Sequence, residues 1–531
     1  MTDSKPNMVE LTEAAGEPRV PVVGASATLQ VFIERQNSLT RREAIREHFK
    51  SILWCFYMFF TCIMFGFDSL AGGVVVSIFE FRKDFGHPYA GDYVVDANWQ
   101  LGFQAATLFG IIIGGLATGL GVNKFGRQPC ILVAYIINTG GIFLQFFSTT
   151  PAHFFGGKIL TGLPLGCFST VAPTYATEMA PISIRGAITA GMNFAIVLGQ
   201  LIGYGVMRQA SFYEGNMTYR VLFAVQWGYV AVGLAVLPFF PESPYWLVAH
   251  GRHEKARHNL ARVHSPGYDI DGHMVEIHDS LARQNAENES QGTLAECFSK
   301  KHMKRTLVAT SMFFIQNASG NAWVIGYMSY FMQLGGMSAA TSFDMTVGMS
   351  GLMVVGNMCG WVFVEKFGRR ATALYGTAVL TLALFVIGIL ACIKTNGAIW
   401  GQVAFMAVWS FVYQGTVGSA AWPISAENPS SRLRAPTQSL ATMMNGLSSC
   451  IWSFSLPYAI NPDQGNLGGK IAFIFGAVVA ASCVFVWFFI PETKNRTFIE
   501  IDELYERGIP AWKWKKTEIL TVSEGKLGDA Q

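Results

Sequence analysis

The feature that most constrains this chain is a series of long apolar runs. A helix of roughly 20 apolar residues is long enough to cross a hydrocarbon core of about 30 Å. Twelve such runs occur, at about 52–76, 100–121, 129–149, 154–175, 187–208, 220–240, 305–330, 340–363, 371–393, 400–425, 437–459 and 470–490. The sequence therefore predicts an all-α membrane protein with twelve transmembrane helices.

The composition agrees with a membrane protein. Hydrophobic residues make up 51% of the chain and charged residues only 14%, which excludes an ordinary soluble enzyme of two or three domains. A soluble protein with twelve buried helices is the competing interpretation. The sequence shows no nucleotide-binding loop, no spacing typical of a metal site and no nucleophile triad. We therefore expect no enzymatic activity, no cofactor, no metal and no nucleic-acid partner.

The distribution of Lys and Arg predicts the orientation. Basic residues gather in alternate loops, such as "NKFGR", "SIRG", "EKFGRR" and "SSRLR", and in the segment 241–304. The positive-inside rule then places these loops and both termini in the cytoplasm. Arg82 and Lys83 in the first outer loop are a mild exception. Asn216 begins a glycosylation sequon in a loop that this topology places outside, so we expect Asn216 to carry a glycan.

Three motifs occur twice, at separations of 242, 249 and 250 residues. The pairs are "VNKFGRQ" at 122–128 with "VEKFGRR" at 364–370, Glu178 and Arg185 with Glu427 and Arg434, and "PESPYWL" at 241 with "PETKNRT" at 491. The chain is therefore predicted to be a duplicated six-helix unit. Parallel repeats of six helices are the layout of transporters that rock two halves around a central site.

The repeat defines the expected organisation. The predicted parts are a cytoplasmic N-terminal tail (1–50), an N-terminal six-helix half (51–240), cytoplasmic inter-half helices (241–304), a C-terminal six-helix half (305–490) and a cytoplasmic C-terminal tail (491–531). The repeated motifs fall at the cytoplasmic ends of both halves. Their arginines can bond carboxylates and helix C-terminal carbonyls there, which would hold the halves together when the protein opens outward.

The candidate residues of this cytoplasmic gate are Arg127, Glu178, Arg185, Glu242, Glu365, Arg369, Arg370, Glu427, Arg434 and Glu492. The alternative interpretation is that these charges only set the topology.

As a set, these motifs resemble the sugar porter family of the major facilitator superfamily, over about residues 50 to 510. "GYMSYF" (326–331), "ENPSSRLR" (427–434) and "RTFIEIDELYERGIPAWKWKKT" (496–517) are similar to fungal alpha-glucoside (maltose-type) permeases. The resemblance implies a major facilitator fold and proton-coupled import of a sugar, an alpha-glucoside or a hexose. We expect a monomer in the lipid bilayer of the plasma membrane, with a small sugar-like substrate and protons as its partners.

The resemblance also implies a set of substrate-binding residues. A sugar needs amides for its hydroxyls and an aromatic platform for its ring. The matching residues are Asn193, Gln316, Asn317, Asn321, Trp422 and Asn445. Amides inside apolar runs are costly unless they are bonded or face a cavity. For each amide the alternative is a hydrogen bond that holds two helices together, and for Trp422 it is ordinary packing.

Asp68 lies in "IMFGFDSLAGG", inside the first apolar run. A carboxylate near the centre of a membrane costs about 2.5–3.5 kcal/mol, so it is usually protonated, paired or exposed to water. The resemblance implies that an acid at this position carries the coupled proton and pairs with an arginine. This chain has "GGKILTG" at the partner position, so the expected partner is Lys158. A structural ion pair is the alternative.

Other functions stay open at this point. Within the transporter class, the chain could be a facilitator or an exporter of a small sugar-derived metabolite. From another class, some relatives of sugar porters are sensors that do not transport. Such sensors usually have a long cytoplasmic tail, whereas only about 40 residues follow "PET" here.

Overall fold

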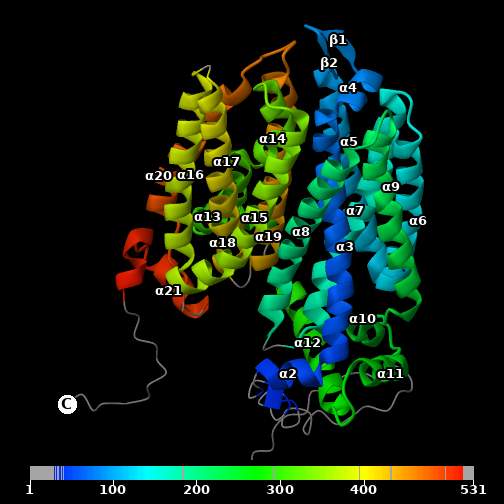
Figure 1. Cartoon of the computed structure of the whole chain (residues 1–531). Helices are drawn as coiled ribbons and strands as arrows, with labels where there is room; N and C mark the ends of the chain where they lie inside the picture. The colour runs from blue at the N-terminus through cyan, green and yellow to red at the C-terminus, as the bar shows by residue number, and fades with distance from the viewer. Residues whose placement is uncertain are drawn as a thin grey trace, which may run out of the picture.

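The computed structural model describes Leu29, Phe32, Arg35, Gln36, Leu39 and residues 41–181, 184–290, 293–393, 395–430, 433–494, 496 and 498–517. Most of the predicted N-terminal tail and residues 518–531 of the C-terminal tail lie outside the described residues. Two bundles of helices stand side by side (Figure 1), the first formed by the N-terminal half and the second by the C-terminal half.

The N-terminal half contains the first six predicted spans. They are α3 (Phe49–Val74), α5 (Ala97–Phe125), α6 (Arg127–Phe146), α7 (Pro151–Met179), α8 (Arg185–Ala210) and α9 (Met217–Val236). The C-terminal half contains α13 (Met303–Gln316), α14 (Ala322–Leu334), α15 (Ala339–Phe367), α16 (Arg369–Ala391), α17 (Asn396–Gly415), α18 (Val417–Glu427), α19 (Arg434–Ile460) and α20 (Ile471–Phe489).

Nine helices among the described residues are long and apolar enough to cross a membrane, and they coincide with nine of the predicted spans. The other three predicted spans correspond to α13 with α14, α17 with α18, and α19. The first of these is interrupted by a π-helical turn, Asn317–Asn321, in which Gly320 has φ 91°. The second is interrupted at Thr416 (φ −127°, ψ −84°). The protein is therefore a multi-pass membrane protein in which two spans of the C-terminal half are broken.

The cytoplasmic side carries further helices, some in the segment 241–304, where inter-half helices are expected, and others in the two tails, where none was predicted. They are α2 (Arg41–Glu47), α10 (Pro244–Ala249), α11 (His253–Val263), α12 (Ile270–Ser290) and, after the last span, α21 (Phe498–Glu506). Figure 1 shows these helices at the end of the molecule opposite to α4. We call that end cytoplasmic, because it carries the basic loops, and the other end extracellular.

The extracellular end contains elements that the sequence did not predict. A helix, α4 (Phe79–Phe85), is followed by an antiparallel hairpin of β1 (His87–Tyr89) and β2 (Asp92–Val94). Arg82, the exception to the charge rule, is buried in this region. Its Nη1 donates to the carbonyls of Val76 (3.2 Å) and Ser77 (3.0 Å). Arg82 therefore holds the outer end of the first span in place.

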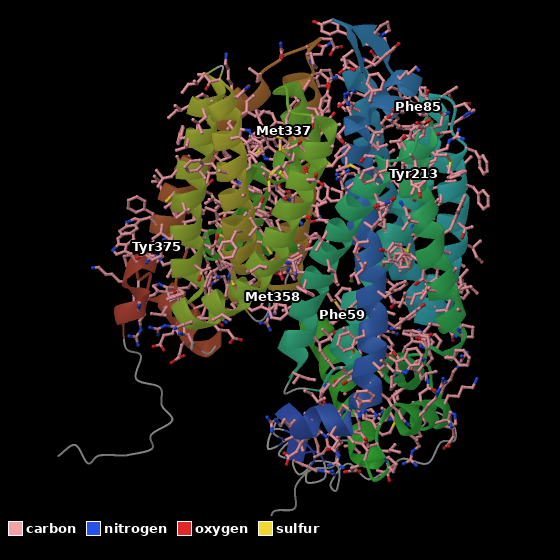
Figure 2. The ribbon with its side chains drawn as sticks, in the orientation of Figure 1. Phe59, Phe85, Tyr213, Met337, Met358 and Tyr375 are labelled. Atoms are coloured by element: carbon pink, nitrogen blue, oxygen red, sulfur yellow. The ribbon has the colours of Figure 1, made fainter. Side chains whose placement is uncertain are left out.

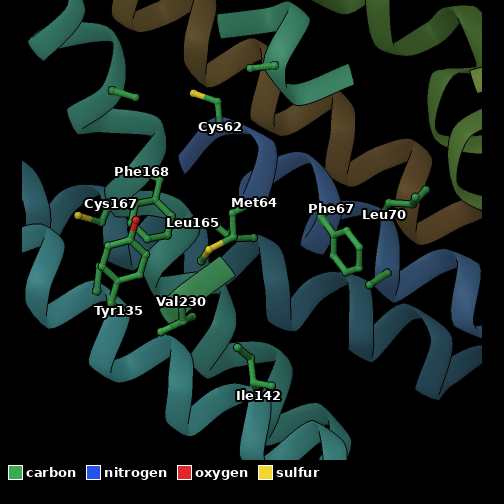
Figure 3. Close-up of a cluster of buried hydrophobic side chains, with 14 of the residues drawn as sticks. Cys62, Met64, Phe67, Leu70, Tyr135, Ile142, Leu165, Cys167, Phe168 and Val230 are labelled. Carbon is green, nitrogen blue, oxygen red and sulfur yellow. The ribbon is translucent and has the colours of Figure 1, made fainter. Parts of the chain in front are cut away.

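The buried core of the N-terminal half consists of aromatic, aliphatic and sulfur side chains. Figure 3 shows part of it, where Met64 of α3 lies near Phe168 of α7 and Tyr135 of α6, with Phe67 and Leu70 further along α3. The outer surface is also apolar. Figure 2 shows Tyr375 on the outer face of the C-terminal half, where it is 71% exposed. In a membrane such side chains contact lipid, so their exposure is consistent with a membrane-spanning bundle.

Glycines allow the helices of the N-terminal half to pack backbone against backbone. A Cβ at Gly199 of α8 would overlap the carbonyl of Ile63 on α3, and a Cβ at Gly66 of α3 would overlap the carbonyl of Ile196 on α8. Small residues are the usual means by which membrane helices approach closely. The contact between α3 and α8 therefore depends on both glycines.

We predict that Gly199→Ala destabilises the protein, because the new methyl group overlaps a backbone carbonyl that cannot move without shifting a whole helix. Overpacking of this kind costs about 1–3 kcal/mol. Gly205→Ala on the same helix is the matched control, because nothing lies within 4 Å of its Cβ position. The measurement is the thermal unfolding midpoint of the purified proteins in detergent. Equal midpoints for the two variants would contradict the prediction.

Candidate functional site

Hydrogen bonds join the two halves at the extracellular end. Asn461, which follows α19, receives a bond from Gln100 Nε2 of α5 (2.9 Å) and donates to the carbonyl of Val95 (3.0 Å). Tyr458 donates to Asn98 Oδ1 (2.6 Å). Further along the same end, Arg208 of α8 forms an ion pair with Asp344 of α15. The structure is therefore closed toward the outside.

Six of the ten predicted gate residues form clusters, one at the cytoplasmic end of each half. In the N-terminal half, Arg127 pairs with Glu178, while the carboxylate of Glu242 accepts the backbone N–H groups of Arg127 and Gln128, both at 3.0 Å. Gly126 has φ 96°, and a Cβ there would lie 2.6 Å from a carboxylate oxygen of Glu242. The repeated loop therefore needs glycine both for its backbone and for the close glutamate.

The C-terminal half repeats this arrangement. Arg369 donates to Glu427 Oε1 from Nη2 (2.9 Å) and Nε (3.2 Å), and Glu492 accepts the backbone N–H of Arg369 (2.9 Å). Gly368 has φ 95°, and a Cβ there would overlap the carboxylate of Glu492. The duplicated motifs therefore form the same arginine–glutamate cluster at the cytoplasmic end of each half, and we call these two clusters the cytoplasmic locks.

The remaining gate candidates lie apart from these locks. Glu365 is exposed near the end of α15. Arg370 donates to the carbonyls of Trp487 (2.7 Å) and Ala511 (3.4 Å), and Arg434 to the carbonyl of Ala426 (3.5 Å). The side chain of Arg185 lies outside the described residues. Asn216 is exposed in the extracellular loop before α9.

Asp68 and Lys158 lie together in the interior of the N-terminal half. Lys158 Nζ of α7 is 3.5 Å from Asp68 Oδ1 of α3, and the two side chains are 0% and 1% exposed. Gln226 of α9 also donates to Asp68 Oδ1, at 3.0 Å. Asp68 Oδ2 is buried without a hydrogen-bond partner. Because its second oxygen is open, this carboxylate can accept a proton without first losing a bond.

The surroundings of Lys158 compensate only part of its charge. Besides Asp68, the ammonium lies 6.0 Å from the ring centre of Phe154 and 5.9 Å from that of Phe223. The Lys158 side chain packs against Gly72 of α3. Its Cε and Nζ lie 3.5 and 3.6 Å from the position that a Cβ on Gly72 would occupy. Aromatic faces attract a cation only weakly compared with a carboxylate. The charge of Lys158 therefore depends mainly on Asp68.

The sequence analysis missed Gln226. It lies in the sixth apolar run, where an amide must be bonded or face a cavity, but the resemblance that singled out Asn193 did not include it. What the sequence could not show is that α3, α7 and α9 bring Asp68, Lys158 and Gln226 to one point.

Four of the substrate candidates lie at the interruption of α13–α14 or next to it. Asn317 Nδ2 donates to Asn445 Oδ1 of α19 (2.7 Å) and to the carbonyl of Phe313 (3.0 Å). The side chain of Gln316 hydrogen-bonds that of Tyr413 on α17, which the sequence did not single out. Asn321 Oδ1 is buried without a partner. The structure therefore gathers amides around a broken helix, where π-helical turns are frequently functional.

The other two candidates lie on neighbouring helices. Trp422 of α18 is 49% exposed, and its ring lies edge-on to Phe313 with centres 5.0 Å apart. Asn193 is half-buried on α8 of the other half. The structure has features of both interpretations of these residues, substrate binding and helix packing. The bond between Asn317 and Asn445 joins two helices, while Gln316, Asn321 and Trp422 leave polar or aromatic surface for a ligand.

The described part of the N-terminal tail packs onto the cytoplasmic helices through a histidine cluster. Burial and the neighbouring His264 lower the pKa of His48 to about 4, and burial lowers the pKa of His264 to about 4. Their rings meet edge to face with centres 5.0 Å apart. Both are therefore neutral at cytosolic pH. Their contribution to stability is fully present above about pH 6.5 and is lost as the pH falls toward 4.

Comparisons with known proteins place the chain among transporters. A family model described as "Sugar (and other) transporter" matches residues 54–505. A general alpha-glucoside permease of Saccharomyces cerevisiae is 30% identical over 499 residues, which cover 92% of this chain and 81% of the permease. The maltose permease MAL31 of the same yeast is 29% identical over 507 residues, covering 94% and 82%.

Solved structures show the same fold. The inward-open conformation of the xylose transporter XylE from E. coli has a TM-score of 0.71 and 21% identity, covering 86% of this chain and 99% of XylE. A structure of XylE described as a major facilitator superfamily proton:xylose symporter, bound to 6-bromo-6-deoxy-D-glucose, has a TM-score of 0.66 at 21% identity. The chain therefore has the all-α major facilitator fold that the motifs predicted.

The buried pair yields a stability prediction. Lys158→Ala leaves the carboxylate of Asp68 buried with only Gln226 as a donor, and losing one partner of a buried pair costs about 3–5 kcal/mol. We expect the thermal unfolding midpoint of Lys158→Ala, measured on purified protein in detergent, to fall clearly below that of the unmodified protein. Asp68→Asn combined with Lys158→Met removes both charges and should recover most of the loss. A midpoint unchanged by Lys158→Ala would show that the pair is not formed.

Proposed function

Because the chain belongs to the sugar (and other) transporter family, we propose that it is a secondary transporter that imports a sugar, an alpha-glucoside or a hexose, together with protons. The names of its yeast relatives support an alpha-glucoside as substrate. The observation that carries the proposal is the buried ion pair of Asp68 and Lys158, with Asp68 Oδ2 unpartnered inside a membrane span. The proposal assigns the chain no enzymatic step.

Asp68 and Lys158 are proposed to couple proton movement to conformational change. A proton that enters from outside binds Asp68 and neutralises it, which leaves Lys158 without the one close counter-charge that it has among the described residues. A buried, uncompensated ammonium is costly, so the protonated form favours a different arrangement of the surrounding helices. When the proton leaves toward the cytoplasm, the ion pair forms again. The present structure, with the pair formed and the extracellular end closed, corresponds to the state after proton release.

The geometry provides a path from this pair to the contact between the halves. Lys158 lies across Gly72 of α3, and the next residue, Gly73, packs against Gly326 of α14 so closely that a Cβ there would lie 2.8 Å from the carbonyl oxygen of Gly326. A shift of α3 at Asp68 therefore acts on the contact between α3 and α14. The two cytoplasmic locks would form the opposite gate when the halves tilt the other way.

The substrate is proposed to bind between the halves, at the broken spans of the C-terminal half. Gln316, Asn317, Asn321 and Asn445 supply donors and acceptors for sugar hydroxyls, and Trp422 supplies an aromatic face. Asn193 of α8 would contribute from the other half. A binding site shared between both halves is what allows substrate to bias their relative orientation.

We predict that Asp68→Asn abolishes uphill accumulation of substrate and substrate-driven alkalinisation of the medium, because the amide cannot carry the proton. Exchange of substrate down a gradient should continue. The assay is uptake of labelled alpha-glucosides and hexoses in a transporter-null host, with Asp84→Asn as a control, because Asp84 is an exposed carboxylate on α4. A mutant that still concentrates substrate would identify the protein as a facilitator and remove Asp68 from the coupling mechanism.

We predict that Gln316→Ala weakens the apparent affinity for substrate about tenfold at near-normal surface expression. One lost hydrogen bond costs about 0.5–1.5 kcal/mol, and tenfold corresponds to about 1.4 kcal/mol. Asn357→Ala is the matched control, since Asn357 Nδ2 bonds Gln414 Oε1 (3.5 Å) inside the C-terminal half and lies outside the proposed site. Normal affinity with reduced expression in Gln316→Ala would favour a packing role instead.

A further inference from the structure

Three potential metal ligands from different parts of the chain meet at the extracellular end. One ligand atom from each of His87, Asp96 and Asp463 lies within 4.8 Å of the other two, and the described residues contain this one such group. His87 and Asp96 belong to the N-terminal half, and Asp463 follows α19 in the C-terminal half. Asp463 is too far from the other two in sequence for a spacing to have indicated a metal site.

Asp96 is oriented toward His87 rather than toward its own helix. It occupies the N-cap position of α5, where an aspartate normally accepts a backbone N–H of the first helical turn. Its side chain makes no such bond, and instead its Oδ1 lies 3.0 Å from His87 Nδ1. Asp463 Oδ1 is buried without a hydrogen-bond partner. Two carboxylates thus converge on one imidazole, and one of them has an oxygen that nothing satisfies.

Neighbouring bonds hold this group in place. His87 is fixed by the hairpin, in which it pairs with Val94. On the other side, the chain next to Asp463 is fixed by the Asn461 bonds already described and by Tyr89, whose hydroxyl donates to the carbonyl of Pro462 at 3.2 Å. The cluster is therefore assembled by the contact that closes the extracellular end.

We propose that His87, Asp96 and Asp463 form a binding site for a divalent transition-metal cation such as Zn²⁺, which links the two halves at their extracellular ends. One imidazole and two carboxylates suit zinc better than Ca²⁺ or Mg²⁺, which prefer oxygen ligands alone. Zinc–ligand bonds of about 2.0–2.2 Å require the ligand atoms of a tetrahedral site to be closer to one another than 4.8 Å. The side chains of His87 and Asp96 are partly exposed, so they can rotate to bring their ligand atoms to that separation. Water would complete the coordination.

The location of the site gives the ion a specific effect. Opening the extracellular end separates Asp463 from the other two ligands, so a bound ion must be released or lose a ligand before the transporter can face outward. Zinc outside the cell should therefore stabilise the inward-facing state and slow the transport cycle.

The test measures binding first, because binding does not depend on the identity of the substrate or on proton coupling. Full-length protein in detergent is dialysed against Zn²⁺, and the bound metal is quantified. The unmodified protein should bind about one Zn²⁺ per chain at this site and unfold at a higher temperature with the ion. His87→Ala and Asp463→Asn should each weaken binding at least tenfold. His153→Ala is the matched control, because His153 is another exposed histidine at the extracellular end.

Binding by His87→Ala and Asp463→Asn at unchanged affinity would overturn the site. The second measurement is substrate exchange, in which external Zn²⁺ should inhibit the unmodified protein and His153→Ala, reversibly on addition of EDTA, but not His87→Ala. Zinc that binds at this site without slowing exchange would overturn the link between the halves. If the protein moved no sugar at all, the proposed function would fail while the binding result would still decide the metal site.

Discussion

The structure depends on one constraint: within a bilayer, every backbone group and every charge must find its partner inside the protein. Uninterrupted helices of 29 residues, such as α5 and α15, satisfy this constraint through their own backbone hydrogen bonds. At the interrupted spans, side chains bond backbone carbonyls near the breaks. Trp409 Nε1 donates to the carbonyl of Ser319 inside the π-helical turn (3.0 Å), and Thr416 bonds the carbonyl of Val412 (2.6 Å) at the other break. In the described part of the chain, the breaks in these two spans and the charges of Asp68 and Lys158 thus lie in the interior, which is where a transport site must lie.

Duplication explains why the cytoplasmic ends of the two halves are alike. In each half, an arginine after a left-handed glycine bonds a glutamate at the end of the fourth helix of that half, and a second glutamate after the sixth helix accepts the arginine's backbone N–H. The same loop geometry therefore arises twice from the same residue types. The extracellular end has no such repeat. There, β1 and β2 belong to the N-terminal half alone, and the bonds between halves involve different residue types on each side.

Much of the fold could be predicted because its signals are local. Hydropathy predicts the spans, and motif spacing predicts the two halves. The pair of Asp68 and Lys158 could also be predicted, since a charge inside an apolar run requires a partner. Gln226, Tyr413 and Asp463 could not be assigned, because their roles depend on which helices or loops meet. The hairpin was missed for a different reason: strands of three residues give no periodic pattern, and only the turn at Ala90 and Gly91 marks it.

The distribution of bonds also indicates where coupling must act. Glu178, Glu242, Glu427 and Glu492 each accept bonds within their own halves, although Glu178 Oε2 is buried without a partner. Bonds across the closed cytoplasmic gate would therefore mostly replace existing ones, with a small net gain. At the extracellular end, water can replace the bonds of Tyr458 and Arg208 when it opens. Asp68 and Lys158 differ, because they are almost fully buried and water cannot substitute for either partner. In the proposed mechanism, protonation of Asp68 removes the counter-charge of Lys158 and thereby changes the relative free energies of the two states.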